Sequence, residues 1–223
     1  MCKVFFIEGP DYSGKTTLIK NLYNYLKSNG KRVAIFREPD GEFRKMLLDK
    51  DGNLSFATRR ALFAADHLQT LDMIYLSRDK YDYIFVDRCT IVSDLVYSRY
   101  ETENSFLRGR VSDNYQAQYQ VIDNYQYNNF FKLNSALIIL KLPKQELLNR
   151  MVSRAIDKND KFDIQGDDFK VGVWTNYKDI TKMIMDNDIK LHPLFRMIST
   201  IEVDDNLLNN AIDVITEGEE KNV

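Results

Sequence analysis

Glycine, lysine and threonine stand at a chemically informative spacing near the start of this 223-residue chain. The stretch from Gly9 to Thr16 reads G-x-x-x-x-G-K-T, the pattern of a loop that binds phosphate groups. Its glycines let backbone N–H groups converge on phosphate oxygens, and a helix that starts there adds its dipole. Lys15 would reach the β- and γ-phosphates of a nucleotide, and the Thr16 hydroxyl would hold Mg²⁺. The residues expected to bind ATP are Gly9, Asp11, Tyr12, Ser13, Gly14, Lys15, Thr16 and Thr17.

An ordinary turn between a strand and a helix is the alternative interpretation of this loop. Residues 3–7, just before it, form an apolar run with the length and composition of a buried strand. After it, Leu18, Leu22, Tyr25 and Leu26 repeat at helical spacing. Strand, glycine turn and helix are the context that the phosphate loop needs, so the sequence favours nucleotide binding.

Strand-like and helix-like segments alternate along the rest of the chain, which predicts a parallel sheet covered by helices on both faces. Ligands of such sheets bind beyond the carboxyl ends of the strands. No linker or repeat divides the sequence, so we expect one domain over residues 1–223. Further strands are predicted at 32–36, 82–87, 136–142 and 199–203. Helices are predicted at 58–78, 112–131, 144–155, 167–187 and 206–217.

Charged residues follow two of these strands. Arg37 comes at the end of the second strand, where it could pair with the phosphate of a second substrate; a solvated loop arginine is the alternative. Asp87 and Arg88 follow the third strand. A carboxylate placed there beside a phosphate loop commonly serves Mg²⁺. Asp87 or Thr90 could instead cap the next helix.

Phe63 and His67 are four residues apart on one face of the predicted helix 58–78. An aromatic ring and a polar group on one face suit a base that is stacked and hydrogen-bonded. A phenylalanine at helical spacing can equally belong to the core.

Arg150 and Arg154 lie one turn apart and lead into a polar segment, so that residues of about 150–165 suit a lid that closes over a triphosphate. A solvated charged helix face is the alternative.

Composition limits the class of protein further. The net charge of −2 provides no basic field for nucleic acid. Two cysteines, Cys2 and Cys89, are no disulfide framework, and the sequence contains neither an apolar stretch of 18 residues nor a signal peptide. We therefore expect a cytoplasmic protein whose partners are small-molecule nucleotides, not nucleic acid or membrane.

At these residues the chain resembles the thymidylate kinases. That family carries F-x-x-x-E-G-x-[D/E]-x-[S/A]-G-K-[S/T]-T, then R-E-P-G-G, L-F-x-A-x-R, D-R-Y/H and an arginine-rich lid. The matching segments here, in the same order and at about the same spacing, are 5–17, 37–41, 62–67, 87–89 and 150–163. The resemblance covers essentially the whole chain.

The resemblance implies a role for each matching residue. Lys15 and the loop amides would hold the donor phosphates, and Thr16 and Asp87 would serve Mg²⁺. Asp11 would contact the sugar hydroxyl of the acceptor nucleotide. Tyr12 stands where one branch of the family has a catalytic arginine, so this chain resembles the branch that takes that arginine from the lid. The acceptor residues implied are Asp11, Arg37, Phe63, His67, Arg88, Ser93 and Tyr97, and the catalytic ones are Lys15, Asp11 and the lid arginines Arg150 and Arg154.

Three residues depart from the family pattern. His67 replaces the arginine that reads the base, Cys89 replaces an aromatic residue or histidine, and Asp40 replaces a glycine. The helix with Ser93 and Tyr97 is shifted by one residue against the family. These departures bear on the identity of the base more than on the reaction.

The resemblance implies a P-loop kinase with a five-stranded parallel sheet, which as a homodimer converts ATP and dTMP, or a close relative such as dUMP or a 5-substituted dUMP, into ADP and the diphosphate. A deoxynucleoside kinase is one alternative, and Glu38 is the only candidate for the base it would need. A nucleotide-binding module without turnover is another. The pair Arg37 and Arg88 favours a phosphate acceptor.

Overall fold

The computed structural model of the chain describes residues 2–48, 54–102, 134–153, 166–189, 191 and 195–217. Five parallel strands form one sheet in the order β2-β3-β1-β4-β5. They are β1 (Lys3–Glu8), β2 (Val33–Arg37), β3 (Tyr83–Asp87), β4 (Asn134–Lys141) and β5 (Phe195–Glu202). The predicted α/β fold with a five-stranded parallel sheet is confirmed.

Strand β1 lies at the centre of the sheet and is apolar on both faces. Val4 and Phe6 pack into one core cluster, whereas Phe5 and Ile7 pack into the other. A strand covered on both sides reads as a continuous apolar run because neither face meets water. The buried strand predicted at residues 3–7 is therefore confirmed, and the structure places it at the centre of the sheet.

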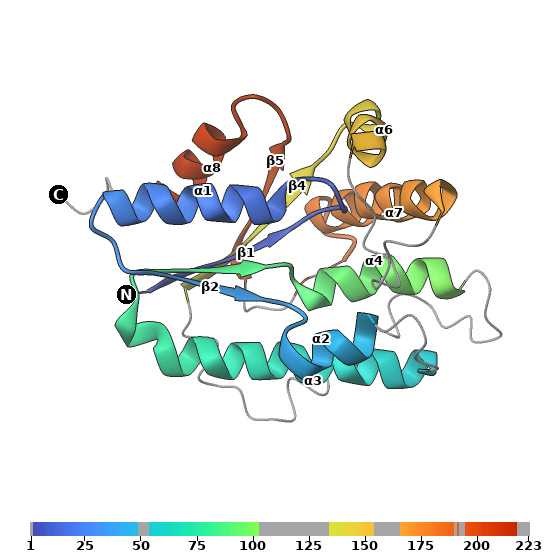
Figure 1. Ribbon diagram of the computed structural model, residues 1–223, viewed down its shortest axis with the longest axis horizontal. Helices are drawn as coiled ribbons and strands as arrows, with labels where there is room; N and C mark the ends of the chain where they lie inside the picture. The colour runs from blue at the N-terminus through green and yellow to red at the C-terminus, as the bar shows by residue number, and fades with distance from the viewer. Residues whose placement is uncertain are drawn as a thin grey trace.

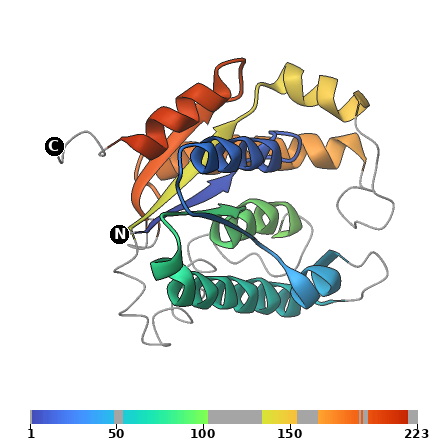
Figure 2. The same ribbon diagram turned by 60° about the vertical axis from the view of Figure 1, so that its left-hand side comes forward.

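Helices cover both faces of this sheet (Figures 1 and 2). On one face lie α1 (Lys15–Ser28) and α8 (Leu207–Thr216), whose buried leucine, isoleucine and alanine side chains share a cluster with Phe5. On the other face lie α3 (Phe56–Ser77), α4 (Thr90–Thr102) and α7 (Asp167–Met185). The shorter helices are α2 (Gly41–Leu48), η1 (Arg78–Lys80) and α6 (Lys144–Ser153).

Most predicted boundaries fall close to the observed ones. Helix α3 starts two residues earlier than predicted, after Ser55, whose hydroxyl accepts a hydrogen bond from the Thr58 backbone. Strand β5 starts at Phe195, four residues before the prediction. Helix α2 is not predicted, because it is short and Leu47 is its one buried side chain among those described. The predicted helix at 112–131 and lid residues 154–165 lie outside the described residues.

None of the described helices has both the length and the apolar character that crossing a bilayer requires.

Candidate active site

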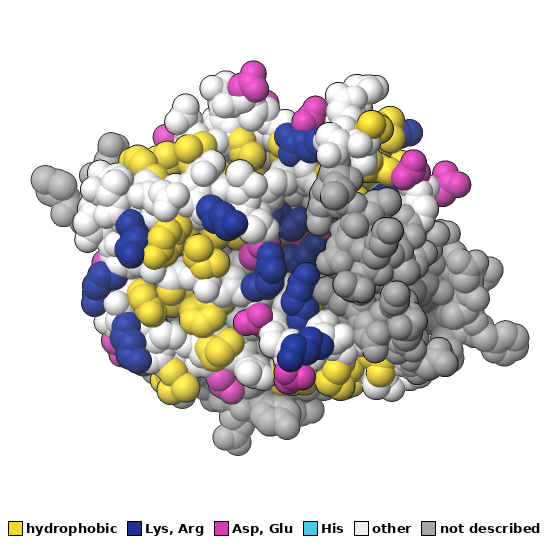
Figure 3. Space-filling view, in the orientation of Figure 1, with side chains coloured by type: hydrophobic (Ala, Val, Ile, Leu, Met, Phe, Trp, Pro, Cys, Tyr) yellow, Lys and Arg dark blue, Asp and Glu magenta, His cyan; other side chains and the backbone are white. Residues whose placement is uncertain are grey.

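Glu8, Arg37 and Asp87 are the last residues of the three neighbouring strands β1, β2 and β3. A pocket of about 520 Å³ opens at this edge of the sheet. Figure 3 shows lysine and arginine side chains gathered near the middle of one face of the molecule. Lining residues come from the phosphate loop, the strand ends and five helices: Asp11, Tyr12, Gly14, Lys15, Thr16, Thr17, Glu38, Pro39, Arg44, Phe63, Asp87, Arg88, Thr90, Ser93, Tyr97, Arg150 and Ser153.

The phosphate loop depends on two glycines. Gly9 has a φ of 149°, and a Cβ atom there would lie 2.9 Å from the carbonyl oxygen of Leu140. Gly14 adopts the left-handed conformation that begins α1. The Lys15 ammonium donates to the carbonyl oxygens of Gly9 and Pro10 at 2.7 and 2.9 Å, so it lies within the loop. Burial and the nearby Arg88 lower the pKa of Lys15 to about 8.

Asp87 joins the phosphate loop to strand β2. Its Oδ2 accepts hydrogen bonds from Thr16 Oγ1 at 2.6 Å and from Arg37 Nη2 at 3.2 Å. A hydroxyl and a carboxylate in contact are suitable ligands for Mg²⁺ together with phosphate oxygens and water. The Arg37 side chain is 42% exposed and stands beside the pocket without belonging to its lining.

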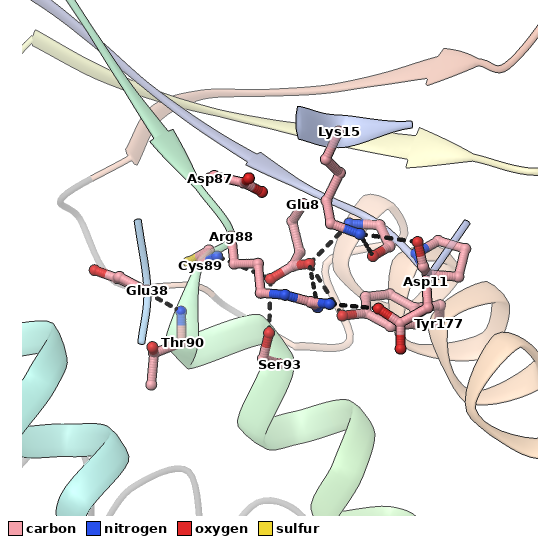
Figure 4. A network of polar contacts seen from close by, with 12 residues as sticks. Glu8, Asp11, Lys15, Glu38, Asp87, Arg88, Cys89, Thr90, Ser93 and Tyr177 are labelled. Carbon is pink, nitrogen blue, oxygen red and sulfur yellow. Dashed lines mark hydrogen bonds and ion pairs between the residues drawn. The ribbon is translucent and has the colours of Figure 1, made fainter. Parts of the chain in front are cut away.

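Arg88 and Asp11 form an ion pair inside the pocket (Figure 4). The backbone of Arg88 has a φ of 84°, a left-handed conformation that is uncommon outside glycine and that often marks functional positions. Burial alone would raise the pKa of Asp11, but the adjacent charges of Arg88 and Lys15 lower it to about 2. The Tyr97 hydroxyl donates to the second oxygen of Asp11 at 3.2 Å. These are three of the predicted acceptor residues, and the structure brings them together.

Glu8 organises the floor of this site from a fully buried position. Its carboxylate accepts hydrogen bonds from the backbone N–H groups of Gly9 and Cys89, and from the hydroxyls of Ser93 and Tyr177, at 2.8 to 3.0 Å. Figure 4 shows three of these partners around Glu8: Cys89 from the turn between β3 and α4, Ser93 from α4 and Tyr177 from α7. Glu8 is absent from the predicted site residues. An acidic residue at the end of an apolar strand, directly before the loop, was the available sequence indication.

His67 is not among the residues that line the pocket, and its expected contact with the base stays a prediction. Its ring is buried, and Nδ1 lies 2.8 Å from Oε1 of Glu38. The other Glu38 oxygen accepts from the Thr90 backbone N–H at 2.7 Å. Phe63, one turn earlier on α3, does line the pocket.

Arg150 is the lid arginine that the structure describes. It extends from α6, with Nη1 donating to the backbone carbonyl of Tyr12 at 2.8 Å and Nε to Glu146 at 2.5 Å. The guanidinium therefore lies over the phosphate loop, as the prediction requires. Arg154 lies outside the described residues.

Five lining residues are absent from the predicted site residues: Glu38, Pro39, Arg44, Thr90 and Ser153. Arg44 belongs to α2, the helix that the sequence does not predict. The sequence suggests Thr90 only as a possible helix cap. In the structure Thr90 lines the pocket, and its buried hydroxyl has no hydrogen-bond partner among the described residues.

Comparison with known proteins gives a consistent picture. A family model of thymidylate kinase matches residues 7–191. The thymidylate kinase of Caldicellulosiruptor saccharolyticus is 29% identical over 195 residues, which cover 81% of this chain and 84% of that protein. The thymidylate kinase of Campylobacter hominis is 28% identical over 189 residues, which cover 81% of this chain and 87% of that protein. The solved structure of thymidylate kinase from Candida albicans shares the fold, with a TM-score of 0.63 and 18% identity. The match covers 98% of this chain and 92% of that one. Since the family model spans the phosphate loop and all three strand ends of the pocket, this chain belongs to the thymidylate kinase family.

Proposed function

We propose that this chain is a dTMP kinase, which transfers the γ-phosphoryl group of ATP to dTMP and releases ADP and dTDP. One observation carries the proposal: Thr16 and Arg37 donate to the same oxygen of Asp87. Thr16 belongs to the loop that would bind the donor, and Arg37 stands on the acceptor side. The two phosphates that react would therefore lie side by side across one carboxylate.

Thr16 and Asp87 would hold Mg²⁺, which when bound neutralises charge on the β- and γ-phosphate oxygens. The described part of the chain contains no group of three or more His, Cys, Asp or Glu side chains that could hold a metal. A site with one carboxylate and one hydroxyl suits Mg²⁺, because that ion usually keeps several waters and takes further ligands from substrate phosphates.

The chain's own residues contribute position and charge. The acceptor phosphate is already an anion at neutral pH, so no strong base is needed to deprotonate it. Lys15 would turn from the carbonyls of Gly9 and Pro10 to the donor phosphates, whose charge would raise its pKa again. Arg150, held over the loop, would meet charge that develops on the transferring group.

The opposite end of the pocket would bind the nucleotide acceptor. Arg88 would contact its phosphate, Asp11 and Tyr97 its sugar, and Phe63 would stack on the base. Position 67 holds a histidine whose ring contacts Glu38, where the family has an arginine that reads the base. We therefore include dUMP and 5-substituted dUMP among the acceptors.

The pocket gives less support to a deoxynucleoside kinase. Such an enzyme needs a carboxylate base at the sugar hydroxyl, and Glu38 is the candidate. Glu38 is fully buried, and its two oxygens accept from His67 and from the Thr90 backbone.

For the whole protein, we extend the proposal to a cytoplasmic homodimer, on the family resemblance alone.

A coupled assay of ADP release with a panel of acceptors tests the proposal. The panel is dTMP, dUMP, 5-hydroxymethyl-dUMP, thymidine and a reaction without acceptor. We expect kcat/KM to be highest for a thymidylate-like monophosphate and thymidine to give no more ADP than the blank. A preference for thymidine would favour the deoxynucleoside kinase, and absence of turnover with every monophosphate would favour a non-catalytic module.

A further inference from the structure

A second pocket, of about 410 Å³, lies between α7 and the ends of β4 and β5. It shares no lining residue with the candidate active site. One side is a single face of α7, formed by residues at helical spacing: Trp174, Tyr177, Lys178, Thr181, Lys182 and Met185. Leu140, Leu142, Pro143 and Pro10 supply an apolar wall opposite. The volume falls in the usual range of about 300–1,000 Å³ for sites that hold small molecules.

The rim of this pocket is cationic. Lys178 and Lys182 stand one turn apart on α7, are exposed, and make no ion pair with any residue that the structure describes. Lys141 is paired with Glu202 at 3.4 Å, so these two charges offset each other. Asp186, beyond Lys182, is the remaining charged lining residue. Two unpaired lysines against one aspartate leave one positive charge beside an aromatic wall.

Two lining residues connect this pocket to the phosphate loop. The carbonyl oxygen of Pro10 accepts a hydrogen bond from Lys15, and the Tyr177 hydroxyl donates to Glu8. Figure 4 shows Tyr177 reaching from α7 toward Glu8 and Arg88. A molecule in the second pocket would thus pack directly against the back of the loop, in the arrangement that keeps Lys15 on the loop carbonyls.

We propose that this pocket is a second binding site for a small aromatic anion, whose ring packs against Trp174 and Tyr177 and whose charge pairs with Lys178 and Lys182. The occupant stabilises Pro10 in its present position and so holds Lys15 away from the donor phosphates. Binding therefore lowers the rate of phosphoryl transfer without competing with the acceptor nucleotide. The second half of this inference rests on the proposed kinase function, and the first half does not.

Trp174 is the only tryptophan of the chain, so its fluorescence reports on the pocket directly. The probe is 4-bromobenzenesulfonate, whose bromine quenches indole emission, and the matched probe of opposite charge is 4-bromobenzylammonium. Each is titrated into the protein with dTMP in excess, which keeps the probes out of the acceptor site; ADP is left out because its phosphates would draw Lys15 from the loop carbonyls. We expect saturable quenching by the anion, with an affinity at least about tenfold above that of the cation.

Charge reversal on α7 supplies the second arm of the test. The double variant Lys178→Glu/Lys182→Glu should bind the anion at least about tenfold more weakly. Lys20→Glu/Lys27→Glu, on exposed positions of α1 on the other face of the sheet, should leave its affinity unchanged. Equal affinities for the two probes, quenching that does not saturate, or an unchanged affinity in the α7 variant would overturn the binding site.

Turnover supplies the third arm. In steady-state assays the anion should lower kcat while leaving KM for dTMP unchanged, and the α7 double variant should lose this inhibition. Binding without inhibition in an active enzyme would overturn the connection through Pro10 and Tyr177. Because the fluorescence titration needs no catalysis, a failure of the binding site and a failure of the proposed kinase function remain distinguishable.

Discussion

His67 Nδ1 lies 2.8 Å from Oε1 of Glu38, and both side chains are buried. The other oxygen of Glu38 accepts from the Thr90 backbone, so one carboxylate joins α3 to the start of α4. Thr90 lines the acceptor pocket, as does Phe63 on α3. His67 is thus a positioning residue that holds the wall of the pocket, and the base-reading arginine of the family has no counterpart at this position.

Removal of the His67 donor tests this role. His67→Ala leaves a buried carboxylate oxygen without a partner, which we expect to cost about 1–3 kcal/mol of unfolding free energy and to raise KM for dTMP. His67→Asn, whose amide nitrogen can stand near the position of Nδ1, should recover most of both losses. Urea unfolding and steady-state kinetics measure the pair. Because the structure places His67 against Glu38 and outside the pocket lining, the kcat/KM ratio of dTMP to dUMP should stay unchanged in His67→Asn; a changed ratio would support direct contact with the base.

Lys15→Ala should lower kcat by about 100-fold or more while the protein stays folded. The ammonium is buried in the loop that would cradle the donor phosphates, on the carbonyl oxygens of Gly9 and Pro10. Lys20→Ala, on an exposed position of the same helix, is the control. Near-normal turnover in Lys15→Ala, with circular dichroism unchanged, would remove the loop from catalysis.

Arg37 and Arg88 should act on the acceptor. Each alanine substitution removes a charge-assisted contact of about 1.5–3 kcal/mol with the monophosphate, so KM for dTMP should rise about tenfold or more. The affinity for ATP, measured by calorimetry, should change little. Arg88→Ala should have the larger effect, because Arg88 also holds Asp11. Poor ATP binding with normal acceptor binding would assign both residues to the donor site.

Arg150 should act late in the reaction. Its guanidinium already lies over the loop, on the Tyr12 carbonyl, but the charge that it would meet appears fully only in the transition state. Arg150→Ala should therefore reduce kcat far more than it weakens binding of either nucleotide, and Arg154→Ala should do the same if the lid contributes both residues. Small and equal effects on kcat and KM in both variants would make these arginines ordinary surface charges.

Asp66 should make stability depend on pH. Burial, with the nearby Glu38 carboxylate, raises its pKa to about 7, although the Asp40 backbone N–H opposes this shift. The folded protein thus keeps a proton on Asp66 that the unfolded chain loses near its usual pKa of about 4. Between about pH 4 and about pH 7, the folded protein therefore binds more protons at Asp66 than the unfolded chain does. The contribution of Asp66 to the free energy of unfolding falls as pH rises through this range.

Asp66→Asn mimics the protonated carboxyl and removes that dependence. We expect the variant to have a higher Tm than the parent at about pH 8 and a similar Tm at about pH 4. Asp72→Asn, an exposed position on the same helix, should show no such pH-dependent difference. A lower Tm for Asp66→Asn at about pH 8 would mean that the fold stabilises the ionised carboxylate, so that the pKa of Asp66 is not raised.

Local patterns suffice for the sheet and the phosphate loop, but not for the partners of the buried acids. An apolar run before G-x-x-x-x-G-K-T predicts β1, the loop and α1 because each feature depends on neighbouring residues. Glu8 instead meets partners 81, 85 and 169 residues away, and His67 meets Glu38 across 29 residues. No periodicity encodes such contacts, so the sequence indicates a polar group at position 67 but not its contact with Glu38.

The most direct test of the account follows the phosphoryl group itself. ATP carrying a labelled γ-phosphate is incubated with Mg²⁺, the enzyme and dTMP, or with thymidine in a parallel reaction, and the products are separated. We predict that the label lost from ATP appears at the β-position of dTDP, with one ADP for each dTDP and no product from thymidine. Label in dTMP formed from thymidine, or only in inorganic phosphate, would contradict phosphoryl transfer to a monophosphate.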